Sequence, residues 1–195
     1  IRKRYWLYYL LQFLSGARRQ IFVVFAGFMM VERFGMDVQQ LTTLYLINLI
    51  LNIGLAPLLG RAVARYGERN ALVLEYFGLA LVFFAYGGIY LFGWGILIAA
   101  SLYILDHLFF ALALAIKTYF QKIADPQDIA ATAAVAFTIN HIAAIFLPVS
   151  LGFLWLKSPF LVFCTAGTLA IFSFVLALLI PREPRIGKET IFCVS

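Results

Sequence analysis

The stretch Gly60–Asn70 reads GRAVARYGERN and lies between two long apolar runs, residues 41–59 and 71–92. Each run is about 20 residues long, and a helix of that length covers the roughly 30 Å hydrocarbon core of a bilayer. The stretch itself is short, holds two glycines and carries three arginines. It is therefore predicted to be a tight loop between two antiparallel membrane helices, and its arginines place it on the cytoplasmic side.

The composition of the whole chain favours a membrane protein over a soluble one. Hydrophobic residues make up 64% of its 195 residues, charged residues only 12%, and the mean hydropathy is +0.97. Soluble domains usually contain about 25% charged residues. The formal net charge of +6 comes mostly from residues between apolar runs. Membrane topology explains such a pattern, so we expect the lipid bilayer as the surroundings and no nucleic-acid partner.

Six apolar runs can be marked along the chain. All are predicted to be helices, because an open strand edge is not satisfied in lipid and the alternating pattern of a barrel is absent. The predicted fold is all-α and integral to the membrane: one domain of six transmembrane helices with a cytoplasmic tail at residues 181–195. The helices are expected at about residues 5–30, 41–59, 71–92, 96–120, 129–155 and 160–180.

Basic residues are distributed unevenly between the two ends of the predicted bundle. Ten lie on the side of Gly60–Asn70 and two on the other side, so the positive-inside rule predicts that both termini are cytoplasmic. The expected location is a cell membrane, with a bacterial inner membrane as the first choice. The ten are Arg2, Lys3, Arg4, Arg61, Arg65, Arg69, Lys122, Arg182, Arg185 and Lys188, and the two are Arg33 and Lys157.

Polar residues inside the runs are the candidates for a functional site. Arg18 and Arg19 lie near the middle of the first run, Asp106 in the fourth, and Asn140 and His141 in the fifth. A charge at mid-bilayer costs at least about 2.5–3.5 kcal/mol, so these residues should face the bundle interior or a water-filled cavity. An ion pair between Arg18 and Asp106 is expected, serving either as a structural pair or as part of a substrate site. Adjacent arginines point about 100° apart, so one partner does not serve both.

The third and sixth runs carry no charge near mid-membrane, and Glu75 is placed at the cytoplasmic start of the third. The order of the runs is thus polar, polar, apolar, repeated twice. We therefore expect the third and sixth helices to be peripheral. No phosphate loop, cysteine–histidine metal spacing or nucleophile elbow is present, so the sequence indicates no enzymatic activity, no cofactor and no metal.

The basic stretch resembles the loop between the second and third helices of each half of major facilitator superfamily transporters. The resemblance rests on Gly60, Arg65, Gly67 and Arg69, while Ala64 stands where that family usually has an acid. Phe137–Ile142 also looks like the eleventh helix of some bacterial members. The resemblance implies a conformational role for these four residues and makes the chain the C-terminal six helices of a twelve-helix transporter. It further implies a cavity lined by the first and fourth helices, flanked by the second and fifth and supported by the third and sixth.

Two functions follow as hypotheses. In the first, the chain is half of a secondary transporter that moves a small anionic solute by alternating access, together with an N-terminal half or partner subunit. Its substrate-binding residues would be Arg18, Arg19, Asp106, Asn140 and His141. In the second, the chain is a membrane scaffold or assembly subunit of the same fold that does not transport, and its charges are structural pairs.

Overall fold

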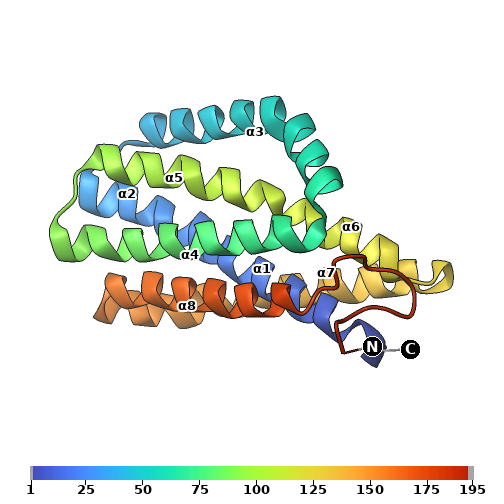
Figure 1. Cartoon of the computed structure of the whole chain (residues 1–195). Helices are drawn as coiled ribbons and strands as arrows, with labels where there is room; N and C mark the ends of the chain where they lie inside the picture. The colour runs from blue at the N-terminus through green and yellow to red at the C-terminus, as the bar shows by residue number, and fades with distance from the viewer. Residues whose placement is uncertain (1, 193–195) are drawn as a thin grey trace.

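The computed structural model describes residues 2–192, and in this range the chain is built from helices joined by short links, with an irregular tail after α8. Six helical segments are long and apolar enough to cross a membrane, as the sequence predicts (Figure 1). The first segment comprises η1 (Lys3–Tyr5), α1 (Trp6–Ile21), η2 (Phe22–Ala26) and α2 (Gly27–Phe34). The second segment is α3 (Val38–Tyr66), and the third is α4 (Glu68–Phe92). The fourth comprises α5 (Ile96–Phe110), η3 (Ala111–Ala113) and α6 (Leu114–Ile123), the fifth comprises η4 (Pro126–Asp128) and α7 (Ile129–Lys157), and the sixth is α8 (Pro159–Leu178).

The basic stretch Gly60–Asn70 is helical, and the prediction of a loop there is wrong. Helix α3 continues to Tyr66 and α4 begins at Glu68, so that Gly67 alone links them. Gly67 has φ +84°, a conformation that glycine adopts without the steric cost other residues meet. Alanine and arginine are good helix formers, so the residues before Gly67 extend the helix instead of ending it.

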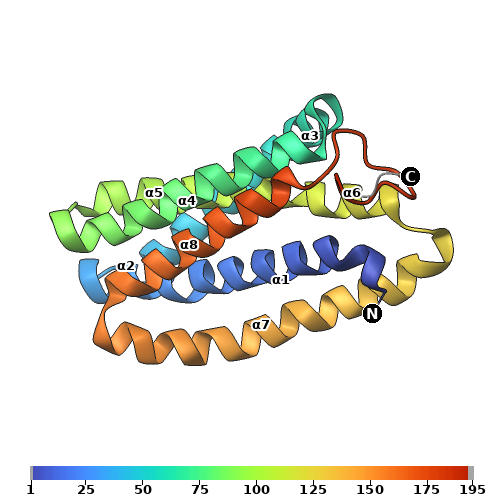
Figure 2. The same ribbon diagram turned by 60° about the horizontal axis from the view of Figure 1, so that its bottom comes forward.

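Helices α4 and α8 lie side by side along most of their length and form the most extensive pair in the chain (Figures 1 and 2). Helix α1 packs against both α8 and α7, and in Figure 2 it runs between them. Most of α4 and α1 is buried, whereas α3 and α7 expose most of their side chains. The expectation that the third and sixth helices are the peripheral ones is therefore wrong, because α4 is among the most buried segments and α8 is more buried than α3 or α7. Small residues such as Gly78 and Gly167 let large rings pack against α4 and α8, which places α4 in the interior.

Three segments depart from straight α-helical geometry. Helix α3 contains Pro57, which lacks the N–H of a regular helix turn, and the helix bends in its second half (Figure 1). The first segment contains the π-helical stretch Phe22–Ala26 directly after its two arginines, and the fourth contains the 3₁₀ turn Ala111–Ala113. Such irregular turns often lie near functional sites. Here the 3₁₀ turn lines the cavity described below, and the π-helical stretch begins two residues after Gln20, the last residue of the first segment that lines it.

The start of the first segment and the tail after α8 lie at one end of the bundle, together with the α3–α4 and α6–η4 links (Figures 1 and 2). We call it the basic end. Arg4 forms ion pairs with Asp125 and with Glu189 of the tail. Arg2 pairs with Asp128 at 2.8 Å, and Lys122 pairs with Glu68 at 2.6 Å. These contacts tie the first helix, the α6–η4 link and the tail together, and they also hold the start of α4.

Candidate functional site

A cavity of about 650 Å³ lies between the first, fourth and fifth helical segments. Its floor and walls come from the middle of α1, from Phe110 to Lys117 across η3, and from the middle of α7. The residues that line it with polar side chains are Gln12, Ser15, Arg19, Gln20, Lys117, Asn140 and His141. The structure thus brings together three of the five predicted substrate residues, namely Arg19, Asn140 and His141.

Helices α1 and α7 approach closely at Gly16. A side chain at this position would place its Cβ 1.8 Å from Asn140 Oδ1, so only glycine fits beside Asn140 in this arrangement. The amide of Asn140 donates a hydrogen bond of 3.4 Å to Gln12 Oε1, and Gln12 in turn donates to the hydroxyl of Tyr8. Because Gln12 and Asn140 hold each other across the helix contact, they give the cavity one wall of fixed amide groups.

The charge of the cavity is positive. Arg19 and Lys117 both line it with exposed side chains, and none of its lining residues is acidic. The guanidinium of Arg19 lies 5.9 Å from the ring centroid of Phe110, close enough for a cation–π interaction that helps to orient it. A positively charged hollow with amide and aromatic walls is suited to a small organic anion, because cations bind the charged group while amides and rings contact the rest.

His141 lies at the edge of this cavity and remains exposed. Its Nδ1 is 2.9 Å from the carbonyl oxygen of Phe137, one turn earlier in the same helix. Its ring packs on the Phe137 ring, with the two ring centroids 4.0 Å apart. The histidine is thus held by its own helix. Among the described residues, its other ring nitrogen has no hydrogen-bond partner, so that nitrogen is free to contact a solute in the cavity.

Arg18 lies outside the cavity, in the buried interior, with 1% of its surface exposed. Its guanidinium is 3.8 Å from Glu75 Oε1 on α4, lies 4.3 Å from the ring centroid of Tyr76, and donates to the carbonyl of Leu14. The predicted direct ion pair with Asp106 is wrong: within residues 2–192, Arg18 has its ion pair with Glu75 instead. The two arginines point in different directions, as the rotation of about 100° per helical residue requires.

Asp106 is also buried, at 2% exposure, and its Oδ1 has no hydrogen-bond partner in the described structure. It lies close enough to Arg18 of α1 and Glu75 of α4 for their charges to influence one another. Glu75 is the functional candidate that sequence reasoning missed. The sequence places Glu75 at the membrane surface because the third apolar run begins at residue 71, whereas α4 begins at Glu68, two turns before Glu75.

The four residues of the basic stretch do not line the cavity. Gly60 and Arg65 lie in the last turns of α3, Gly67 is the link, and Arg69 lies in the first turn of α4. Arg65 stacks on Tyr66 at 5.7 Å from its ring centroid. In the described part of the chain, Glu68 is the charged residue of this link that forms an ion pair, with Lys122 of α6.

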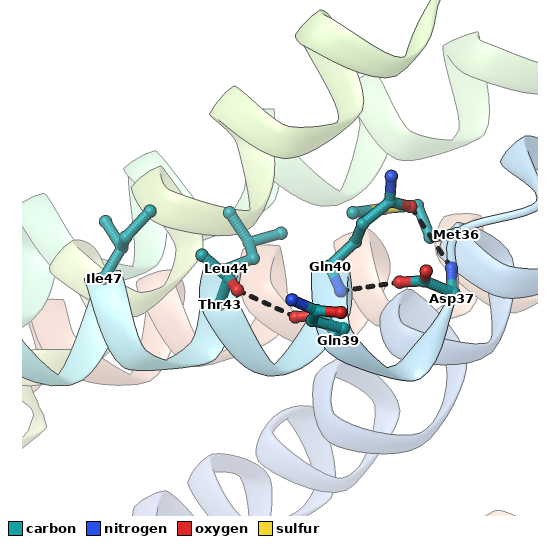
Figure 3. A pocket seen from close by; sticks show the side chains of 7 residues that line it. All are labelled: Met36, Asp37, Gln39, Gln40, Thr43, Leu44 and Ile47. Carbon is teal, nitrogen blue, oxygen red and sulfur yellow. Dashed lines mark hydrogen bonds between the residues drawn. The ribbon is translucent and has the colours of Figure 1, made fainter.

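A second hollow, of about 500 Å³, lies along the first turns of α3 (Figure 3). The side chains of Asp37 and Gln40 in its lining are already used to cap the helix. The Asp37 carboxylate accepts from the Gln40 backbone N–H at 2.8 Å, while the Gln40 side chain accepts from the Asp37 N–H at 3.2 Å. This reciprocal capping box satisfies the free backbone groups of the helix start. The hollow therefore belongs to the architecture of α3.

Among the described residues, no group of three or more His, Cys, Asp and Glu side chains is arranged to hold a metal ion. No known protein-family model matches the chain, and no curated protein matches it at a significant level.

Proposed function

We propose that the chain is a multi-pass membrane protein with its basic end in the cytoplasm, and that it forms one half of a secondary transporter for a small organic anion. The single observation that carries the proposal is the cavity between α1, η3–α6 and α7. Its lining holds the cations Arg19 and Lys117 and lacks a carboxylate. Arg19, Asn140 and His141 are the proposed solute contacts, joined by Lys117 and Gln12.

The position of the cavity supports this role. It lies part-way along the first, fourth and fifth helical segments, away from the links at either end. Solute sites of secondary transporters typically lie near the membrane midplane at the contact between two halves. The resemblance of the basic stretch to major facilitator transporters points the same way. A partner half would close the cavity on its open side and alternate its access.

The proposal is tested by equilibrium binding to the purified chain in lipid nanodiscs. The ligands are small mono- and dicarboxylates, with a neutral sugar and an organic cation for comparison. We expect carboxylates alone to bind, and Arg19→Gln or Lys117→Gln to weaken binding roughly 10- to 100-fold, as expected for the loss of a charged hydrogen bond of about 1.5–3 kcal/mol.

Arg69→Gln is the matched control, because Arg69 carries the same charge but lies outside the cavity. It should leave carboxylate binding unchanged. Binding that falls equally in Arg69→Gln and Arg19→Gln would reflect the net charge of the chain, and would contradict a site at Arg19. Uptake of the bound carboxylate into proteoliposomes, with a partner half if the gene encodes one upstream of Ile1, then tests transport itself.

One observation favours the alternative of a scaffold that does not transport. Arg18, the other arginine at mid-helix, is buried against Glu75 and Tyr76, as in a structural pair. A scaffold requires no solute, so a folded chain that binds none of the tested anions would support it.

A further inference from the structure

Three charged side chains are buried in the interior, outside the lining of the cavity. Arg18 comes from α1, Glu75 from α4 and Asp106 from α5, and their exposures are 1%, 0% and 2%. The guanidinium of Arg18 is 3.8 Å from Glu75 Oε1, and Asp106 interacts electrostatically with both. We call this group the buried triad. It contains two carboxyl groups and one guanidinium, so it carries a net negative charge when all three groups are ionised.

Arginine stays protonated in proteins, so only the acids can change their charge. An unpaired carboxylate in a dry interior is strongly disfavoured, and such a group takes up a proton instead. One proton on either acid gives one guanidinium and one carboxylate, which is neutral. From this count we propose that the buried triad binds one exchangeable proton, carried by Glu75 or by Asp106. The proton comes from water and joins a carboxylate oxygen, and its release restores the carboxylate.

The geometry of the contact supports exchange. A strong arginine–carboxylate pair has N–O distances of about 2.7–2.9 Å, often with two parallel bonds. Arg18 and Glu75 are farther apart than that, at 3.8 Å. Both Glu75 oxygens, Asp106 Oδ1 and both terminal nitrogens of Arg18 are buried without a hydrogen-bond partner in the described structure. The triad thus keeps free acceptor positions on both acids where a proton can reside.

The neighbouring titratable groups do not supply a second cation. Helix α4 contributes the phenols of Tyr76 and Tyr86, and α5 contributes Tyr103. His107 of α5 directs its ring to Phe22 and to Tyr45 of α3, and Asn48 of α3 donates to the Tyr103 carbonyl. Helix α8 offers Cys164, and α7 offers His141 at the cavity and Lys157 at its last residue. Within residues 2–192, Arg18 is the cation found within 4 Å of either acid.

The consequence is that the stability of the fold around the buried triad depends on pH. With the proton bound, the triad is neutral and the burial of its three side chains is favoured. Loss of the proton as the pH rises leaves one uncompensated negative charge among them. This inference is independent of the proposed transport function, because the proton is detected without any solute.

The test uses the purified full chain in lipid nanodiscs and infrared difference spectra between acidic and alkaline pH. We expect the wild-type protein to show the C=O stretch of a buried protonated carboxyl group, which disappears as the pH rises. Glu75→Gln and Asp106→Asn should each remove it, because each leaves one carboxylate for one guanidinium. Glu32→Gln is the control, since Glu32 is exposed and its carboxylate accepts a hydrogen bond from the indole N–H of Trp155. This variant should keep the C=O stretch.

Thermal unfolding gives the second readout. The melting temperature of the wild-type chain should step down as the pH rises through the range in which the stretch disappears, and each single variant should lack that step. The proposal is overturned if the stretch is absent in the folded wild type at every pH, or if it persists in both single variants. If a neutral variant does not fold, Glu75→Asp and Asp106→Glu keep both carboxyl groups and should shift the frequency of the stretch; an unshifted stretch in both would also overturn it.

Discussion

At the scale of single residues, the two consecutive arginines have different surroundings. Arg18 is buried with Glu75 and the Tyr76 ring, whereas Arg19 is exposed in the cavity beside Phe110. Burial makes a charge depend on its partners, while exposure leaves it free to bind a solute. The guanidinium group therefore has a structural role at position 18, whereas at position 19 it is the proposed solute contact.

This difference predicts opposite outcomes for one substitution at the two positions. Arg18→Gln removes the cation of the buried triad and should destabilise the chain by about 3–5 kcal/mol, the usual penalty for an orphaned buried charge. Arg19→Gln should change stability by less than about 0.5 kcal/mol, as is usual for exposed positions, and should lower carboxylate affinity instead. Denaturant unfolding and carboxylate binding of both variants check this. Equal stability of the two variants would contradict the buried pairing of Arg18.

At the scale of elements, the contact between α4 and α5 depends on a missing side chain. A Cβ at Gly78 would lie 2.4–2.5 Å from three atoms of the Phe109 ring. Any side chain at position 78 would clash with the Phe109 ring where it lies. Gly54 of α3 lies in a helix as well, but nothing lies within 4 Å of the position of its Cβ.

Gly78→Ala should therefore lower the free energy of unfolding by about 1–3 kcal/mol, the usual cost of overpacking an interior. Gly54→Ala should be neutral or stabilising by up to about 1 kcal/mol, because alanine favours helix over glycine. Unfolding of the two variants under identical conditions gives the comparison. Adding Phe109→Leu to Gly78→Ala should restore part of the loss, and a failure to do so would place the strain elsewhere.

At the scale of the whole molecule, the basic end is held together by contacts between parts far apart in sequence. Glu189 of the tail accepts hydrogen bonds from Arg4 of the first segment and from the backbone N–H of Gly187. The hydroxyl of Tyr119 donates to the Glu189 carbonyl, and the N–H of Ile191 donates to the Leu179 carbonyl. The tail is thus fastened to three different segments.

This fastening predicts a loss of tail contacts in acid. Burial by itself raises the pKa of Glu189, but the hydrogen bonds from Arg4 and from backbone N–H groups outweigh it, and the net pKa lies below the ordinary carboxyl value. A lowered pKa stabilises the fastened state above the ordinary value, and that contribution is lost as the pH falls through the folded value. Hydrogen exchange at the Ile191 amide should therefore accelerate in acid, after correction for the intrinsic rate.

Glu189→Gln should show the faster exchange at neutral pH already. Glu183→Gln is the control in the same tail, because Glu183 is exposed and the described structure gives it no ion pair. An Ile191 amide that exchanges equally in wild type and Glu189→Gln would show that Arg4 does not fasten the tail.

Membrane orientation is the second prediction at this scale. With the basic end in the cytoplasm, a cysteine at Asn70, which is exposed at the start of α4, should resist impermeant maleimide added outside intact cells. A cysteine at Lys157, at the opposite end, should react. Both are made with Cys164 and Cys193 replaced by serine. Labelling of the Asn70 position and protection of the Lys157 position would reverse the topology.

The all-helical class of the protein can be predicted from its sequence. Apolar runs of about 20 residues without the alternation of a barrel strand favour helices, so six helices and their approximate positions follow from the pattern of apolar runs. The sequence also identified Arg19, Asn140 and His141, which share one cavity, because polar residues inside such runs are few and costly. These inferences depend only on the types of residue and on their positions along the chain, both of which the sequence gives directly.

Tertiary structure alone decided which polar residues meet. Glu75 is the carboxylate nearest to Arg18 because α4 begins at Glu68 and packs in the interior, whereas the sequence placed the third helix outside and paired Arg18 with Asp106. The polar residues along a helix do not show how the helix is rotated about its axis or which other helices pack against it. Both depend on close packing at positions such as Gly16 and Gly78, where the absence of a side chain lets two helices approach and brings distant groups together.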